Sequence, residues 1–181
     1  MKLKEKVFEY LCKRQEERKT RFPHFDKPLK ILVIYESDVL ERNDAMKSIR
    51  QDLLKRQMDV TMWGYVEKKE ITSLVLPQSR ILGIADYNWF GKPRDYVLKD
   101  LQSVHYDLLI DLTTHSILPL RYLAMYADAD FKVGLNLGEG IHDMLLSLPD
   151  FTPEQGAQAA IEATWLYSEI MKFVSTVKSL D

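Results

Sequence analysis

The sequence predicts an α/β fold, with helices on both faces of a mainly parallel sheet of about five to six strands. Short apolar runs such as LKILVIYE (29–36) and YDLLIDL (106–112) are typical of strands buried on both faces. Amphipathic segments of helical period separate these runs, and this alternation implies right-handed βαβ crossovers. The chain has 181 residues, 46% of them hydrophobic and 29% charged, which suits a single globular domain over 1–181. The expected architecture is a three-layer, Rossmann-like sandwich.

The N-terminal residues 1–22 are expected to carry an amphipathic helix, running from about Lys2 to Lys19. One side of this helix is apolar and should dock against the rest of the domain through Leu3, Val7, Phe8 and Leu11. The turn around Pro23 and Pro28 is expected to end the helix, because proline lacks the N–H that would continue it.

A strand, a helix and a second strand should follow in close succession. The first strand is expected at 29–36, and a helix from about Asn43 to Gln57, with Asn43 as its N-cap. The segment MDVTMWGYV (58–66) alternates in polarity and predicts the second strand. The next expected elements are a loop or helix start at 67–70, a strand at 81–87, a short helix at 94–104, a strand at 106–112, a helix carrying Leu118 to Met125, a strand at 131–137 and a short sixth strand within 143–148.

A long C-terminal helix is predicted within 152–178, with helical residues from Pro153 to about Val177. Thr152 has the N-cap position, Pro153 the first helical position and Gln155 the capping-box position. Apolar residues occupy most of its circumference, which is typical of a buried helix. Packing under the sheet and against the N-terminal helix is the favoured interpretation, and a homodimer interface is the alternative.

The composition indicates a cellular location and the classes of partner that the chain could bind. Cys12 is the only cysteine, so no internal disulfide forms, and a reducing, cytoplasmic location is expected. No apolar run is long enough to span a membrane or to serve as a signal peptide. The first 30 residues are basic and the remainder is acidic, within a net charge of −2. We interpret the basic segment as a solvated helix face, with a nucleic-acid or membrane arm as the alternative.

Polar side chains follow each predicted strand. Ligands of an open parallel sheet bind outside the carboxyl ends of its strands, so these positions are the candidate ligand-binding residues. They are Glu36, Ser37, Asp86, Asn88, Thr113, Thr114, Asn136, Gly138 and Gly140, with His142 close by. The candidate catalytic residues are Asp111, His115 and Glu139. In particular, His115 could form an acid/base pair with Asp111 or Asp86.

The same loops disfavour several chemistries. The segment YESDVLERND (35–44) contains no glycine, so neither a dinucleotide-binding turn nor a Walker loop is expected there. Residues 114–116 (THS) either hold an anion at a helix N-terminus or, as we favour, cap that helix. The glycines of GLNLGEGIHD (134–143) either approach a ligand or make a tight connection between strands. No cofactor and no metal site is expected, because nothing in the spacing of the carboxylates makes them converge.

The stretch HYDLLIDLTTHSILPLRYLAMYADADFKVGLNLGEG (105–140) resembles part of the N-terminal Rossmann-like half of heptosyltransferase-type (GT-B) glycosyltransferases. Shared features are a Y-D strand ending in D-L, a helix of small and apolar residues, and a strand ending in V-G or I-G. The chain departs from these enzymes in its first loop, which lacks the acceptor-loop glycine, and in lacking their nucleotide-sugar-binding half. The whole pattern also resembles short uncharacterised proteins of Bacteroidetes, which implies a bacterial cytoplasmic setting.

Two functions follow from these observations. The first is a non-enzymatic or small-ligand-binding module, because the fold pattern is clear and no complete catalytic motif accompanies it. The second, which the glycosyltransferase resemblance implies, is an enzyme acting on a sugar, nucleotide or phosphorylated metabolite. A lone cysteine far from the strand ends and the absence of a G-x-S-x-G motif disfavour nucleophilic catalysis.

Overall fold

The computed structural model describes residues 2–15, 18–37, 40–67, 79–137, 140–147 and 158–176. Its elements are α1 (Lys2–Cys12), β1 (Lys30–Glu36), α2 (Leu40–Lys55), β2 (Asp59–Tyr65), β3 (Ser79–Leu82), the 3-10 helix η1 (Ile84–Asp86), α3 (Asp95–Gln102), β4 (Tyr106–Asp111), α4 (Leu118–Tyr126), β5 (Ala129–Leu135), β6 (Met144–Leu146) and α5 (Gln158–Thr176). The six strands form one parallel sheet in the order β3-β2-β1-β4-β5-β6. This arrangement confirms the predicted Rossmann-like α/β fold.

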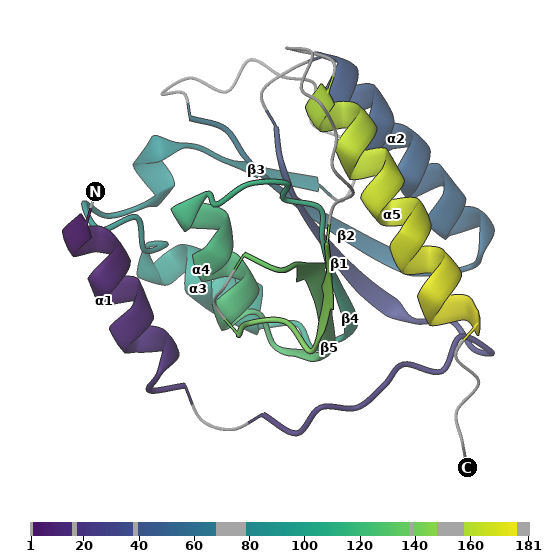
Figure 1. Ribbon diagram of the computed structural model, residues 1–181, viewed down its shortest axis with the longest axis horizontal. Coiled ribbons are helices and arrows are strands. Elements are labelled where there is room, and N and C mark those ends of the chain that lie inside the picture. The colour runs from purple at the N-terminus through teal and green to yellow at the C-terminus, as the bar shows by residue number, and fades with distance from the viewer. Residues whose placement is uncertain are drawn as a thin grey trace.

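The sheet is covered on both faces, as Figure 1 shows. On one face, alternate residues of the central strands pack against α2 and α5 in a large apolar cluster that includes Val33, Ile110 and Leu166. On the other face, the intervening residues pack against α3 and α4. Strands β1 and β4 lie side by side, and Ile34 stands opposite Asp111 in their register. Central strands buried on both faces explain why their sequences are almost continuously apolar.

Helix α1 lies outside α4 and is the outermost element on that side of the sheet (Figure 1). Phe8 is fully buried there, with its ring edge-on to Tyr122 at a centroid distance of 4.8 Å. The Arg121 guanidinium lies 4.3 Å from the Phe8 ring centroid. The predicted docking of the N-terminal helix therefore takes place through an aromatic and cation–π contact with α4.

Two predicted boundaries in the first half of the chain are wrong. Helix α1 ends at Cys12, well before Pro23, because the following chain turns away. Arg18 holds this chain against the start of β5, and Thr20 holds it against Asp143. Helix α2 begins at Leu40, so Asn43 lies within it and is not the N-cap. The Asn43 side chain instead accepts a hydrogen bond from the Ser37 hydroxyl.

The third strand is shorter than predicted, and the last helix packs on a different neighbour. Strand β3 ends at Leu82, because the Asp86 carboxylate accepts a hydrogen bond from the Gly83 N–H and closes a 3-10 turn. Helix α5 packs beside α2, on the sheet face opposite α1, so the predicted contact between the first and last helices is wrong. Its apolar side is occupied within the chain. The predicted cap residues at 152, 153 and 155 lie outside the described residues.

None of the described helices has both the length and the apolar character needed to cross a membrane.

Candidate functional site

The direction of the strand order reverses between the neighbouring strands β1 and β4. From β1 the chain proceeds outward through β2 to β3, and it then returns to the other side of β1 to form β4 and β5. In parallel sheets of this topology, the point where the direction reverses is where ligands bind. The residues that leave the two strands at this point are Glu36 and Ser37 on one side, and Asp111 and Thr113 on the other.

A buried carboxylate–histidine pair lies at the carboxyl end of β4. His142 Nε2 is 3.0 Å from Asp111 Oδ2, and the two side chains are only 6% and 5% exposed. The other carboxylate oxygen, Oδ1, accepts a hydrogen bond of 2.9 Å from the Thr113 N–H. In this contact Nε2 is the ring nitrogen that faces the carboxylate, and the contact orients the imidazole.

Gly134 of β5 makes room for this pair. A Cβ atom at that position would lie 2.8 Å from His142 Nε2 and 3.0 Å from the Asp111 Cβ. The first separation is shorter than real Cβ contacts and the second is at the tight end of their range, so a larger residue would displace the imidazole. One of the glycines noted in 134–143 therefore allows two side chains to approach, which is a packing role.

Substitution of Gly134 by alanine is expected to lower the free energy of unfolding by about 1–3 kcal/mol, because it overpacks a buried site. Urea denaturation of the wild type and of Gly134→Ala gives this cost. The same substitution made in a His142→Ala background should cost much less, since the clashing imidazole is gone. If Gly134→Ala lowers the free energy of unfolding equally in the two backgrounds, the Asp111–His142 pair does not need the space that Gly134 leaves.

A second histidine–carboxylate pair stands at the same edge of the sheet. His115 Nε2 is 3.6 Å from Glu36 Oε2, and the His115 side chain is 59% exposed. Ser37 is buried, and within the described part of the chain the buried Thr113 Oγ1 has no hydrogen-bond partner. The carboxyl ends of β1 and β4 and the segments beside them thus carry two carboxylates, two imidazoles and two hydroxyls. Of the two imidazoles, His115 faces solvent.

The remaining candidate residues have other surroundings. Asp86 accepts hydrogen bonds from the Tyr96 hydroxyl and the Gly83 N–H, and Asn88 closes a turn through the Phe90 and Lys92 N–H groups. Both follow β3, at the far edge of the sheet. His115 is thus paired with Glu36, whereas Asp111 and Asp86 have other partners.

The loop after β4 differs from the predicted helix cap. Helix α4 begins at Leu118 with Ile117 as its N-cap and no side-chain cap, so the proposed capping role of residues 114–116 is wrong. Thr114 is half-buried, and the Ser116 hydroxyl accepts a hydrogen bond from Arg121 at 3.1 Å. Arg121 is buried by α1, and a buried guanidinium needs hydrogen-bond acceptors. This need explains why Ser116 turns toward Arg121 rather than toward the start of the helix.

The loop after β5 is only partly described. Asn136 is exposed, and its backbone N–H bonds to the Leu146 carbonyl of β6. Gly140 has a φ of +65°, with open space around the position of a Cβ. Gly138 and Glu139 lie outside the described residues.

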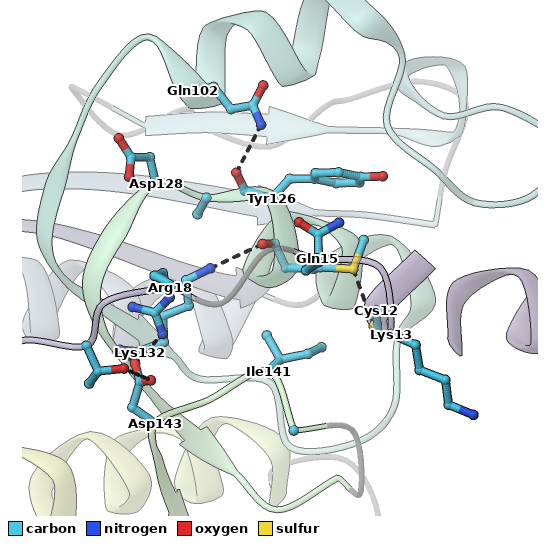
Figure 2. Close-up of a pocket in the computed structure, with 14 residues that line it drawn as sticks. Cys12, Lys13, Gln15, Arg18, Gln102, Tyr126, Asp128, Lys132, Ile141 and Asp143 are labelled. Carbon is cyan, nitrogen blue, oxygen red and sulfur yellow. Dashed lines mark hydrogen bonds and ion pairs between the residues drawn. The ribbon is translucent and has the colours of Figure 1, made fainter. Parts of the chain in front are cut away.

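A cavity of about 770 Å³ lies on the α4 side of the sheet, beneath the chain that leaves α1 (Figure 2). Most of the lining residues are polar, and they come from five parts of the chain: Cys12, Lys13, Gln15, Arg18 and Thr20; Gln102; Met125 to Asp128; Lys132; and Gly140, Ile141 and Asp143. The volume is typical of a small-molecule site. This cavity was not predicted, because it forms where segments distant in sequence meet.

Lys132 of β5 carries a buried amine at the wall of this cavity. The residue is 3% exposed, and its Nζ donates to the carbonyl oxygens of Ala124 at 2.7 Å and Met125 at 3.2 Å. Burial, aided by the nearby Arg18 guanidinium, lowers its pKa from 10.5 to about 7. In the sequence, this buried amine was indicated by a lysine within the mostly apolar strand predicted at 131–137.

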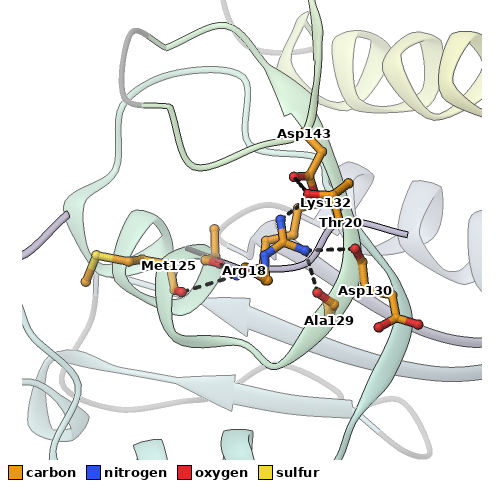
Figure 3. A network of polar contacts seen from close by, with 8 residues as sticks. Arg18, Thr20, Met125, Ala129, Asp130, Lys132 and Asp143 are labelled. Carbon is orange, nitrogen blue, oxygen red and sulfur yellow. Dashed lines mark hydrogen bonds and ion pairs between the residues drawn. The ribbon is translucent and has the colours of Figure 1, made fainter. Parts of the chain in front are cut away.

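Polar contacts join the cavity wall to β5 (Figure 3). The Asp143 carboxylate forms an ion pair with Arg18 and accepts hydrogen bonds from the Thr20 hydroxyl at 2.8 Å and the Lys132 N–H at 2.7 Å. Arg18 also donates to the carbonyl oxygens of Ala129 and Asp130. These contacts hold the segment after α1 against the start of β5, so this wall of the cavity has a defined position.

No group of three or more His, Cys, Asp or Glu side chains within the described ranges is arranged to hold a metal ion.

Comparison with known proteins gives a family and a shared fold. Residues 2–154 match the model of a family described as a family of unknown function, DUF6913. No curated protein sequence matches the chain.

Among solved structures, the chain is similar to E. coli heptosyltransferase WaaC with ADP, at 15% identity and a TM-score of 0.51, covering 77% of this chain and 46% of that one. WaaC with ADP-2-deoxy-2-fluoro heptose gives 16% identity and a TM-score of 0.52, covering 84% and 50%. The chain therefore spans about half the length of these structures. At such identities the likeness shows the fold alone.

Proposed function

This chain belongs to DUF6913, a family of unknown function, and from that premise we propose that it binds a small, uncharged polyhydroxylated compound such as a sugar. The proposed site is the crevice expected at the carboxyl ends of β1 and β4, where the strand order reverses. The observation that carries the proposal is the presence of two histidine–carboxylate pairs, Asp111–His142 and Glu36–His115, at the ends of these neighbouring strands.

The chemistry of the crevice suits hydroxyl groups. Carboxylate oxygens accept hydrogen bonds from hydroxyls, and imidazoles can donate to them or accept from them. The buried Thr113 hydroxyl adds a further donor and acceptor, which needs a partner once water is excluded. Glu36 and Asp111 would repel a phosphate, and the loop after β1 lacks the glycines that bring backbone N–H groups to one. These features favour an uncharged sugar over a nucleotide.

The structural neighbours give limited support of a different kind. The names of both say that they are heptosyltransferases, and one was solved with a fluorinated ADP-heptose. A sugar is thus a ligand class compatible with this fold. We further propose that the module works in the reducing cytoplasm, since its one cysteine, Cys12, cannot form an internal disulfide.

Thermal denaturation with added ligands tests the proposal. We expect neutral aldoses, a heptose among them, to raise the melting temperature in a saturable manner, whereas ADP and inorganic phosphate do not. Saturation at about 100 times Kd corresponds to roughly 2.7 kcal/mol of added stability. A shift with ADP and none with any aldose would overturn the choice of ligand class.

Two matched variants locate the binding site. His115→Gln removes the exposed imidazole of the crevice and is expected to abolish most of the sugar-induced shift. His105→Gln is the control, because His105 is also exposed and paired with carboxylates, Asp128 and Asp130, but at the opposite ends of the strands. If both variants respond to sugar like the wild type, the crevice is not the site.

An enzyme acting on the same compound is the second candidate. Its support is the arrangement of His142, whose ring is oriented by a carboxylate that is itself held by a backbone N–H, as a general acid or base requires. Asp111, His115 and Glu139 remain the proposed catalytic residues. NMR spectra of the sugar during incubation distinguish the candidates, since an enzyme changes the sugar and a binding module leaves it intact. Alanine at all three positions without loss of the sugar-induced shift would reject both roles for them.

A further inference from the structure

We propose that Lys132 is the nucleophilic amine of a carbonyl-binding site in the cavity beneath the segment that follows α1, where it condenses with a small aldehyde or α-keto acid. The proposal concerns a different place from the sugar crevice and does not depend on it. It starts from the position of the amine, which is buried at the wall of a cavity of about 770 Å³.

The hydrogen bonds of Nζ match a neutral amine. A neutral amine has two N–H bonds and one lone pair, and the two carbonyl acceptors at the end of α4, Ala124 and Met125, take one N–H each. The lone pair is then left for a third partner. An ammonium would instead have a third N–H to satisfy in a buried place, which costs free energy.

The charges around Lys132 also favour a reactive amine near neutral pH. Three charged side chains from three segments face it, namely Arg18 after α1, Asp128 between α4 and β5, and Asp143 before β6. Burial and Arg18 lower its pKa, the two carboxylates raise it, and the net result is a pKa of about 7. A substantial share of the amine is therefore unprotonated at pH 7, as Schiff-base lysines require.

The reaction balances without an oxidant or reductant. The Nζ lone pair forms a bond to the carbonyl carbon, and the carbonyl π electrons move to its oxygen, which takes up a proton. Nitrogen then expels that oxygen as water, so one amine and one carbonyl compound give one imine and one water. A protonated imine keeps one N–H, enough for the shorter bond to the Ala124 oxygen, and gives up the 3.2 Å bond to Met125.

Reductive trapping tests the proposal on the full chain. Glyoxylate and sodium cyanoborohydride at pH 7 convert each imine into a stable carboxymethyl-lysine, which peptide mass spectrometry assigns to its residue. We expect Lys132 to be labelled at least about tenfold faster than Lys13, because a pKa of about 7 leaves a substantial share of the Lys132 amine unprotonated and nucleophilic at this pH. Lys13 is the matched comparison, since it is exposed and lines the same cavity.

Variants and mild denaturant make the outcome decisive. Lys132→Arg should remove the fast-labelled site, while Lys13→Arg should leave it in place. Labelling of the wild type at equal rates on Lys132 and Lys13 would overturn the proposal, and this result does not depend on whether any variant folds. A labelling rate of Lys132 that rises steeply with urea below the unfolding transition would also overturn the proposal, because it would show that only the opened chain reacts.

Discussion

Replacing His142 by alanine is expected to lower the free energy of unfolding by about 3–5 kcal/mol. The Asp111 carboxylate is 5% exposed, and it is hydrogen-bonded to His142 Nε2 and to the Thr113 N–H. Without the imidazole, a buried negative charge keeps one hydrogen bond and loses its main partner. Such a charge is far more costly than a missing surface contact, because water cannot replace the donor.

Urea denaturation at pH 7 measures this cost, with His115→Ala as the matched control. His115 is also paired with a carboxylate, but it is largely exposed, so its loss should change stability by less than about 1 kcal/mol. Adding Asp111→Asn to His142→Ala should restore part of the stability, because the amide carries no charge and can still accept from the Thr113 N–H. If His142→Ala costs no more than His115→Ala, the buried pair does not stabilise the fold.

Stability is expected to rise with pH between about 7 and 10 because of Lys132, and Lys132→Met should remove this rise. Folding lowers the pKa of Lys132 from 10.5 to about 7. In that interval the unfolded chain therefore binds a proton that the folded chain does not, so raising the pH favours the folded state. The slope is about 1.4 kcal/mol per pH unit, or roughly 3 kcal/mol between pH 6 and pH 9.

The measurement is a set of urea denaturation curves for the wild type and Lys132→Met at several pH values. The informative quantity is the change with pH in the difference between the two proteins, because it cancels the titration of all other groups. The variant Lys132→Met also loses the hydrogen bonds to Ala124 and Met125, and this loss shifts the stability of the variant by an amount independent of pH. A difference that stays constant from pH 6 to pH 9 would mean that Lys132 titrates normally.

The sequence predicted most of the sheet, because a buried strand can be identified from the apolar residues of its own segment. The runs that contain β1 and β4 are apolar on both sides, so their type follows from neighbouring residues alone. The carboxyl edge of the sheet follows from the same strands, and with it the positions of Glu36, Ser37 and Asp111. Element ends were less predictable, since contacts with distant residues determine them, as Arg18 and Thr20 do after α1.

The partners within the candidate site could not be predicted. Asp111 and His142 are 31 residues apart in sequence, and they meet because β5 and its following loop lie beside β4. The sequence suggested His115 as the partner of Asp111, because His115 is nearer to Asp111 along the chain than His142 is. Register and strand order decide such pairs, and neither leaves a periodic pattern in the sequence.

By itself, the sequence determined the fold class, the strands and the edge of the sheet where polar residues gather. It did so because apolar periodicity reports directly on which residues are buried. The tertiary structure alone decided the order of the strands, the face on which α5 packs, the Asp111–His142 pair and the burial of Lys132 beside a cavity. These features depend on contacts between residues distant in the chain, and the free energy of each is set by the whole packed environment rather than by local sequence.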